Sequence, residues 1–318
     1  ANSYKRMILR KKFGGIQEMY NIVSKLLIYG DMDEESILMQ LSDIFRCMDE
    51  GSQTKDVLRT RVFKQVKRIL EVATDYAFDK NLWHNYLAYL LITNENPFSI
   101  TCEKVGASEG SVNHFAKSDF KAFKELFDFD FGRIEELGVD CFSRISDYQA
   151  IGKPELMYNK NVSEKVQALS ERLETAKDEN EFFDMVTDFY KAYGVGMFGL
   201  NKAFRIEECG DNNIRFRAIN NMDKVVLSDL VGYEIQKQKL VENTEAFVEG
   251  RKANNVLLFG DSGTGKSTSI KAIVNEYYDQ GLRMIEIYKH QFKDLSNVIA
   301  QIKNRNYRFI IYMDDLSF

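Results

Sequence analysis

Apolar residues recur every three or four positions through most of residues 1–193, which is the spacing of a helix with one buried face. Near the start of this region, one predicted helix face carries Ile16, Tyr20, Val23 and Leu27. The same spacing indicates helices in four further places: 31–51, 53–93, from 111 onward, and 163–193. Gly51 suits a helix C-cap, because glycine adopts the left-handed backbone conformation at low cost. The pattern therefore predicts an all-helical N-terminal domain over residues 1–193.

The pattern changes over residues 194–225, which are rich in glycine and then alternate between apolar and polar positions. The segment CGDNN, residues 209–213, is a turn signal between two short strand-like pieces. This combination predicts a small hairpin. We interpret residues 194–225 as the join between two domains.

From residue 226 onward, short apolar runs alternate with helical patterns. The apolar runs are Val256–Phe259, Arg283–Tyr288 and Arg308–Asp315, the last of which ends in two acids. Strands that are apolar throughout are typical of a parallel sheet covered by helices on both faces. We therefore predict that residues 226–318 form a parallel α/β domain and that the whole chain is an α+α/β protein.

Charge and composition narrow the set of partners. The net charge of the chain is −5, and the region from Val226 carries equal numbers of acidic and basic residues. This charge gives no electrostatic argument for binding nucleic acid. The locally basic stretch Lys55–Arg68 has apolar residues at helical spacing, so we interpret it as the solvated face of an amphipathic helix.

The cysteine pattern favours a reducing compartment. The four cysteines are far apart and form no C-x-x-C pair, and the chain has only three histidines. A zinc site or a disulfide framework is therefore not expected, and free thiols are. No run approaches the roughly 18 apolar residues of a membrane span, and the first residues contain no signal-peptide apolar core. We expect a cytoplasmic protein.

The segment GDSGTGKS, residues 260–267, lies between a predicted strand and a predicted helix and fits the phosphate-binding pattern G-x-x-x-x-G-K-[ST]. Its glycines allow successive backbone N–H groups to turn inward around phosphate oxygens. Lys266 would reach the β and γ phosphates, and the Ser267 hydroxyl would bind Mg²⁺. The predicted nucleotide-binding residues of this loop are Gly260, Asp261, Ser262, Gly263, Thr264, Gly265, Lys266, Ser267 and Thr268.

The apolar run that ends in Asp314 and Asp315 is the expected second half of this site. In proteins that bind nucleotides through such a glycine-rich loop, the carboxylate that follows an apolar strand holds Mg²⁺. We assign that metal-binding role to Asp314. We expect Asp315, one residue further on, to point in a different direction, and it is a candidate catalytic acid that would polarise the attacking water, with Lys266 as the other catalytic residue.

These motifs resemble those of AAA+ P-loop ATPases, with GDSGTGKS as Walker A and FIIYMDD as Walker B. In addition, the segment DLVGYE is similar to the stretch that lines the adenine pocket in that superfamily. This resemblance places Leu230, Val231, Gly232 and Tyr233 around the base. The region from Gly194 more closely resembles a bacterial AAA+ family known only as a domain of unknown function (the eight-one-five family). It does so through GVGMFGLNKAF, ANNVLLFGDSGTGKS and FIIYMDDLSF, and the helical region resembles it only loosely.

The resemblance implies an ATP-binding protein with ATP and Mg²⁺ as ligands. We expect the full-length protein to be an ATPase that couples nucleotide binding and hydrolysis to conformational change in a helical domain that recognises a protein partner, with homo-oligomers possible. Most AAA+ ATPases carry Glu as the second acid, so Asp315 implies slow hydrolysis or help from a partner subunit. A nucleotide-gated scaffold and a P-loop small-molecule kinase are the alternatives. We expect the α/β domain to be truncated after the strand that ends at Asp314.

Overall fold

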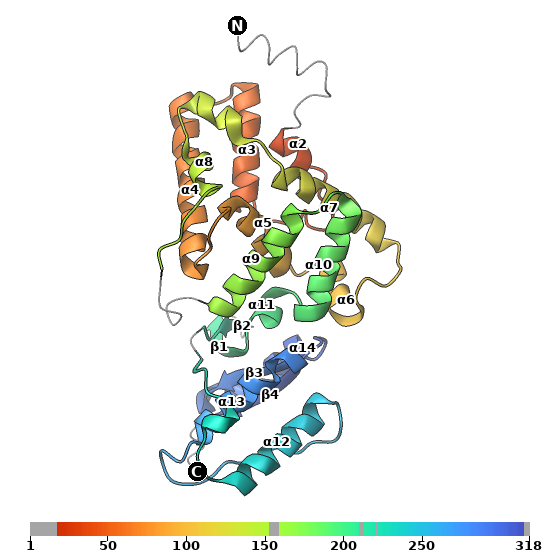
Figure 1. Cartoon of the computed structure of the whole chain (residues 1–318), viewed down its shortest axis with the longest axis vertical. Helices are drawn as coiled ribbons and strands as arrows, with labels where there is room; N and C mark the ends of the chain where they lie inside the picture. Colours follow the sequence, from red (N-terminus) through yellow and green to blue (C-terminus); the bar gives the residue numbers. More distant parts are fainter. Residues whose placement is uncertain (1–17, 153–158, 210–212, 221, 315–318) are drawn as a thin grey trace. The chain divides into compact units, whose positions relative to one another are not determined.

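The computed structural model of the chain describes residues 18–152, 159–209, 213–220 and 222–314. It divides into two compact units. Among the described residues, the first unit contains 18–152 and 163–190, and the second contains 159–162 and 191–314. The first unit is helical and the second is built around a sheet (Figure 1). The N-terminal helical region and the C-terminal combination of helices and strands agree with the predicted α+α/β class.

The first unit consists of helices that follow one another along the chain. They are α2 (Met19–Val23), α3 (Ile37–Glu50), α4 (Lys55–Tyr76), α5 (Leu82–Thr93), α6 (Pro97–Val105), α7 (Val112–Phe127), η1 (Phe131–Leu137), α8 (Cys141–Ile145), α9 (Lys160–Glu174) and α10 (Glu179–Tyr193). Helix α9 begins, and helix α10 ends, with residues of the second unit.

Two details of the helical prediction can be compared directly with the structure. Gly51 is the C-cap of α3 with a φ of 61°, as expected. The helical region predicted over 53–93 consists of two helices, because Ala77 adopts a left-handed conformation (φ 52°) and ends α4. The next helix, α5, begins after Asn81, whose side chain accepts a hydrogen bond from the backbone N–H of His84 and so caps it.

The core of the first unit is aromatic, and the carboxylate of Asp119 is buried within it. On α7, Phe120, Phe123 and Phe127 are all buried. On the same helix, Asp119 is 0% exposed and accepts hydrogen bonds from three consecutive backbone N–H groups, at residues 27–29. Because a buried carboxylate is costly unless it is hydrogen-bonded, these contacts hold the segment after α2 against α7.

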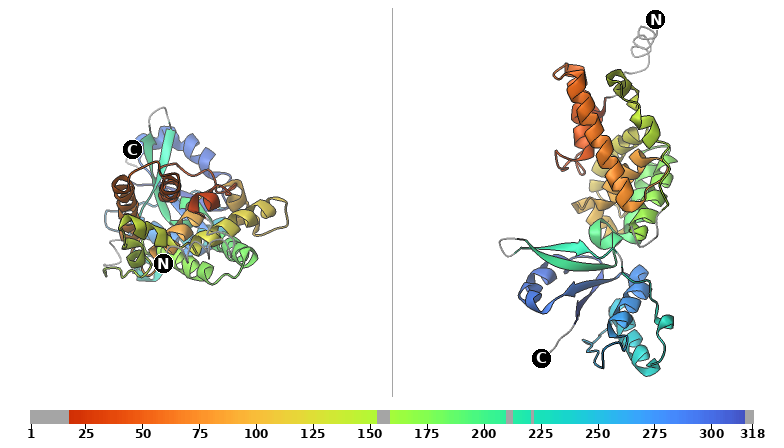
Figure 2. Two further views of the ribbon diagram at one scale, coloured as in Figure 1. Left: turned by 90° about the horizontal axis from the view of Figure 1, so that it is seen from above. Right: turned by 90° about the vertical axis from the view of Figure 1, so that its left-hand side faces the viewer.

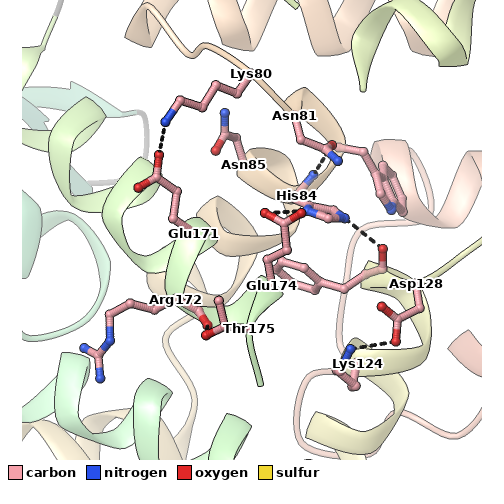
Figure 3. A network of polar contacts seen from close by, with 12 residues as sticks. Lys80, Asn81, His84, Asn85, Lys124, Asp128, Glu171, Arg172, Glu174 and Thr175 are labelled. Carbon is pink, nitrogen blue, oxygen red and sulfur yellow. Dashed lines mark hydrogen bonds and ion pairs between the residues drawn. The ribbon is translucent and has the colours of Figure 1, made fainter. Parts of the chain in front are cut away.

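Polar contacts tie together α5, α7 and α9 in the same unit (Figure 3). The ring Nε2 of His84 lies 2.8 Å from the carbonyl oxygen of Phe127 at the end of α7. The other ring nitrogen, Nδ1, lies 3.9 Å from the carboxylate of Glu174 on α9. Lys80, just before α5, pairs with Glu171 on α9. These helices are therefore joined by side-chain contacts as well as by the apolar core.

The second unit contains a four-stranded mixed sheet in the order β2-β1-β3-β4. Its elements are α11 (Gly196–Leu200), β1 (Ala203–Cys209), β2 (Asn213–Ala218), η3 (Leu227–Asp229), α12 (Glu234–Val248), α13 (Lys266–Tyr277), η4 (Tyr278–Gln280), β3 (Leu282–Ile287), η5 (Lys289–Asp294), α14 (Leu295–Ile302) and β4 (Arg308–Met313). Strands β1 and β2 form the predicted hairpin, with Cys209 opposite Asn213. Strand β3 is parallel to both β1 and β4. The hairpin is therefore part of the main sheet.

Helices cover both faces of this sheet (Figure 2). On one face, Val298 and Ile302 of α14 pack with Phe198 of α11 against strand residues. On the other face, α13 packs through Ile270 and Val274, and α12 packs beside it through Leu240. Burial of these apolar side chains from both sides explains why β3 is apolar along most of its length.

The predicted strand Val256–Phe259 does not form in the structure. This segment has no strand conformation, and Phe259 is 88% exposed. Only Leu258 is partly buried, where it packs against the apolar cluster under α13. A strand needs a partner for its backbone N–H and C=O groups, and within the described residues this segment pairs with none. The prediction of a fully parallel sheet that includes Val256–Phe259 was therefore wrong.

Two findings bear on the expected environment of the protein. The four cysteines are free thiols, and Cys47 and Cys102 are buried. Among the described residues, no helix combines the length and the apolar character that a membrane crossing requires.

Candidate functional site

The glycine-rich loop before α13 has the backbone conformation that its sequence demands. Gly260, Gly263 and Gly265 have φ values of 144°, 80° and 82°. Side chains with a Cβ rarely adopt such angles, so these positions favour glycine. Gly265 is the N-cap of α13, and the helix begins at Lys266. The loop therefore presents its backbone at the positive end of a 12-residue helix.

Side chains of the loop are hydrogen-bonded to its own carbonyl groups. Lys266 Nζ donates to the carbonyl oxygens of Gly260 and Asp261 at 2.9 and 2.8 Å. Thr264 Oγ1 donates to the Asp261 carbonyl at 2.9 Å. A lysine ammonium group has three N–H donors, so these two bonds leave one for a further acceptor. The ammonium group is thus held over the loop.

The loop lies close to the end of β4. Ser267 Oγ, in the first turn of α13, is 3.5 and 3.4 Å from the two carboxylate oxygens of Asp314, although the two residues are 47 positions apart. Asp314 directly follows β4. The sequence motif and the acid that ends the apolar run are therefore brought together in space.

The donor atoms at this point suit a small hard cation. The Ser267 hydroxyl and the Asp314 carboxylate offer oxygen ligands, and Mg²⁺ is usually held by one or two carboxylates together with phosphates and waters. The part of the chain that the structure describes contains no cluster of three or more His, Cys, Asp or Glu side chains that could hold a metal. The residues present fit a Mg²⁺ ion that shares its coordination with phosphate oxygens.

A polar row crosses the sheet and ends at this point. Arg217, Arg205, Glu286 and Tyr312 face one another in register on β2, β1, β3 and β4. Arg205 Nε donates to the Glu286 carboxylate at 2.5 Å, and this ion pair raises the pKa of Arg205. Tyr312 comes two residues before Asp314 in the chain and ends this row on β4. Burial raises the pKa of Tyr312 to about 12, and the negative charge of the nearby Asp314 acts in the same direction.

Of the four predicted adenine-pocket residues, one lies beside the loop. A Cβ added to Gly265 would lie 3.8 Å from Leu230 Cδ2. The Leu230 carbonyl accepts a hydrogen bond from Lys237 Nζ at 2.7 Å, which holds this segment against α12. Val231 is 94% exposed and Tyr233 is 58% exposed, and Gly232 is also exposed. The structure therefore brings Leu230 to the loop and leaves the other three residues exposed to solvent.

The other end of α13 lies close to residues 195–199, which belong to the same unit. Tyr278, directly after α13, donates its hydroxyl hydrogen to the Gly199 carbonyl at 2.9 Å. Arg283 on β3 is 3% exposed and donates from Nε to the Phe198 carbonyl at 2.6 Å and from an amino group to the Tyr278 carbonyl at 2.9 Å. Arg305 donates to the Val195 carbonyl at 2.9 Å. These contacts hold residues 195–199 against Tyr278 at the end of α13, Arg283 on β3 and Arg305 after α14; we call this set the join contacts.

Two predicted residues, Asp315 and Thr268, have not been placed so far, and two residues near the site were not predicted. Asp315 lies outside the described residues. Thr268 lies in the first turn of α13 and is half-buried. Sequence reasoning missed Tyr312 and Arg283. The signal for Tyr312 was its place two residues before Asp314 in a strand, because alternate residues of a strand share a face.

Comparison with known proteins relates the second unit to a protein family. Residues 199–318 match the family described as "Protein of unknown function (DUF815)". The replication factor C large subunit of Methanococcus vannielii is 43% identical over 51 residues, which cover 16% of this chain and 10% of that protein. The same protein from Methanococcus maripaludis strain C5 is 36% identical over 76 residues, covering 24% of this chain and 15% of that protein.

These similarities are confined to a small part of each relative, since the matched stretch spans 10% to 15% of the relatives' length. No solved structure matches the chain. The family match and the short similarities confirm the resemblance of the C-terminal region to the eight-one-five family and to AAA+ P-loop ATPases.

Proposed function

Because its C-terminal region is related to AAA+ P-loop ATPases, we propose that this protein binds ATP with Mg²⁺ at the loop 260–267 and hydrolyses it. The observation that carries the proposal is the proximity of Ser267 Oγ to the Asp314 carboxylate, at 3.4 and 3.5 Å. These two side chains come from the two motifs that bind nucleotide and metal in such ATPases. Their meeting at the start of α13 is what such a site requires.

The residues of the loop would bind the phosphates of ATP. Backbone N–H groups of the loop and the N-terminus of α13 favour anions, since both carry partial positive charge. The third N–H of the Lys266 ammonium group would donate to a phosphate oxygen. Of the DLVGYE segment, Leu230 would contact the bound nucleotide, and its proximity to Gly265 supports this.

Ser267 and Asp314 would hold the metal. Bound Mg²⁺ neutralises charge on the β and γ phosphates during phosphoryl transfer. Asp315 is proposed as the acid that orients the attacking water. A carboxylate one methylene shorter than Glu must be brought closer to that water, so we propose slow basal hydrolysis.

We further propose that the nucleotide state is passed to the helical unit through α13. The helix begins at the loop and ends at the join contacts, so one rigid element touches both. A helix of 12 residues can transmit a shift at its first turn to residues 195–199. The helical unit would then recognise a partner. We propose a protein partner, although the relatives are named as replication factors, because the net charge of −5 does not favour nucleic acid.

Steady-state release of phosphate from ATP tests the proposal. Lys266→Ala should abolish turnover and weaken ATP binding by at least about tenfold, because a charge-assisted contact to phosphate is lost. Lys271→Ala is the matched control, since Lys271 lies on the same helix and pairs with Asp223. Nucleotide binding without turnover would favour a nucleotide-gated scaffold. Transfer of phosphate to a small molecule in place of water would indicate a kinase.

A further inference from the structure

The first part of α4 carries a concentrated positive charge. Residues 55–68 contain six basic side chains and one acidic side chain, a local charge of +5 in a chain whose net charge is −5. The buried face of this helix is largely apolar and packs into the first unit through Leu58, Val62 and Ile69. The charged side chains therefore lie on or beside the solvent face of α4, which the proposed function leaves without a role.

Two of the three arginines in this stretch are held by acceptors within the first unit. Arg59 Nε donates to the carbonyl oxygen of Leu137 at 2.7 Å. An amino group of Arg61 donates to the Asp43 carboxylate at 2.7 Å. Arginine recognises phosphate groups through its planar fork of donors, and in these two residues the fork is already engaged. This stretch is therefore poorly prepared to bind nucleic acid.

The lysines of this stretch lie beside two large apolar side chains that are exposed. Val57 is 49% exposed and Phe63 is 50% exposed. Residues three, four or seven positions apart share one side of a helix. The exposed residues on this side are Val57, Thr60, Phe63, Lys64 and Lys67, and we call them the α4 stripe. The stripe thus combines apolar area with positive charge.

The positive charge of the α4 stripe is only weakly compensated. Lys67 pairs with Glu71 at 3.4 Å, but the two side chains are 77% and 57% exposed. Exposed ion pairs contribute at most about 1 kcal/mol, so a carboxylate of a partner can replace Glu71. From Val57 to Lys67, the stripe is about 15 Å long at about 1.5 Å per residue, which matches about three turns of a partner helix.

We propose that the α4 stripe docks an acidic amphipathic helix of a partner protein. This inference rests on the proposed function, which gives the helical unit a protein partner, and it specifies the surface and the chemistry of that partner. Apolar side chains of the partner helix would pack on Val57 and Phe63, and its carboxylates would face Lys64 and Lys67. In such interfaces an aromatic anchor supplies much of the affinity, and complementary charge speeds encounter and selects the partner. A second copy of this chain is a poor occupant, because pairing α4 with α4 would place two positive surfaces together.

Peptides from a random library test the proposal without a known partner. Phage-displayed peptides of about 16 residues, longer than the stripe when they are helical, are selected on the intact chain. The enriched peptides are synthesised with a fluorescent label. Their affinity for the intact chain is then measured by fluorescence anisotropy at low and at high salt.

Two matched pairs of variants locate the binding. Phe63→Ser is compared with Phe115→Ser, because Phe115 of α7 is also about half exposed, at 52%. Lys67→Glu is compared with Lys177→Glu, because Lys177 forms the same type of i,i+4 pair with Glu181, also at 3.4 Å. Urea unfolding followed by tryptophan fluorescence shows whether each variant is folded.

The enriched peptides should carry a net negative charge and apolar residues at helical spacing. Phe63→Ser should weaken their binding by at least about tenfold, because the aromatic anchor is lost. Lys67→Glu should weaken it by about three- to tenfold and should reduce its dependence on salt. Phe115→Ser and Lys177→Glu should bind the peptides as the wild type does.

The inference is overturned by a selection that enriches no peptide, by enriched peptides without an excess of acids, or by equal binding to Phe63→Ser, Lys67→Glu and the wild type. A DNA duplex that binds through Lys67, or a dimer that Phe63→Ser dissociates, would assign the stripe to nucleic acid or to a second copy and would equally overturn it. Binding of a fluorescent ATP analogue is measured on the same samples. Peptide binding as expected without ATP binding would overturn the proposed nucleotide function and leave the α4 stripe as a docking surface.

Discussion

Replacing Arg283 by methionine should destabilise the second unit by about 2–4 kcal/mol. Arg283 is 3% exposed and donates to the carbonyl oxygens of Phe198, Tyr278 and Leu282 at 2.6, 2.9 and 2.8 Å. Its guanidinium group also lies 4.0 Å from the ring centroid of Tyr278 and 4.5 Å from that of Tyr307. Methionine keeps an unbranched apolar stem but has no donor.

The magnitude follows from the acceptors that lose a donor. The Tyr278 carbonyl keeps a second donor, the Gly281 N–H at 2.9 Å, so it contributes little. The carbonyls of Phe198 and Leu282 each lose a buried charged donor, at roughly 1–3 kcal/mol per unpaired group. Loss of the contacts between the cation and the aromatic rings adds to this destabilisation. Part of the destabilisation is offset, because the variant no longer has the cost of burying a guanidinium charge.

Urea unfolding provides the assay, with two optical probes. The single tryptophan, Trp83, is 2% exposed in the first unit, so its fluorescence follows that unit, whereas far-UV circular dichroism follows both. Arg308→Met is the matched control, because Arg308 is exposed on β4 and should tolerate the change within about 0.5 kcal/mol. A loss for Arg283→Met no larger than that of Arg308→Met would refute the reasoning.

Two further predictions concern stability. Asp119→Ala should lower the free energy of unfolding of the first unit by about 3–5 kcal/mol, because three backbone N–H groups lose a buried charged acceptor. Trp83 fluorescence during urea unfolding measures this loss of stability. The control is Asp128→Ala, which removes a carboxylate with 64% exposure and should cost less than about 1 kcal/mol. Equal losses for the two variants would contradict the role of Asp119. The fold raises the pKa values of Tyr86, Tyr277 and Tyr312 to about 12, above the value near 10 of an unfolded tyrosine. Their stabilising contribution is therefore complete below pH 10 and is lost as the pH rises from 10 toward 12. The urea concentration at the unfolding midpoint should be lower at pH 11 than at pH 9, and this decrease should be smaller in Tyr277→Phe. An unchanged midpoint would exclude this effect.

The helices were predictable where a local signal marks them. Gly51 ends α3 in the left-handed conformation that glycine favours. The end of α4 carries no such signal, because Ala77 is a good helix former that adopts the same conformation at φ 52°. The contacts of the folded unit, and not the propensity of Ala77, decide that boundary.

The strands show even more clearly that local sequence alone does not decide which elements form. Val256–Phe259 and the residues of β4 are both short apolar runs, and their patterns alone do not differ. Whether such a run becomes a strand depends on a partner edge elsewhere in the chain. Strand β4 finds β3, whereas Val256–Phe259 pairs with no described strand. The hairpin β1–β2 was predictable from its turn, but its place beside β3 was not.

In the candidate site, the conformation of the loop was predictable, because the loop is contiguous and its glycines take positive φ values. The two motifs also predicted that Ser267 and Asp314 lie close together, and in the structure these residues, 47 positions apart, approach within 3.4 Å. The supporting residues were harder to predict. Arg283 interrupts an apolar strand, and that charge was a signal of a buried polar role, but its carbonyl partners come from the distant segment 198–199.

Diffraction from crystals soaked with a non-hydrolysable ATP analogue and Mn²⁺ tests the central claim most directly. The anomalous signal of manganese locates the metal independently of the phosphates. The account predicts phosphate density over the loop 260–267 beside Lys266, with one manganese peak in contact with Ser267 Oγ and the Asp314 carboxylate. Nucleotide density elsewhere on the protein, or phosphates over the loop with the manganese bound away from Asp314, would contradict it.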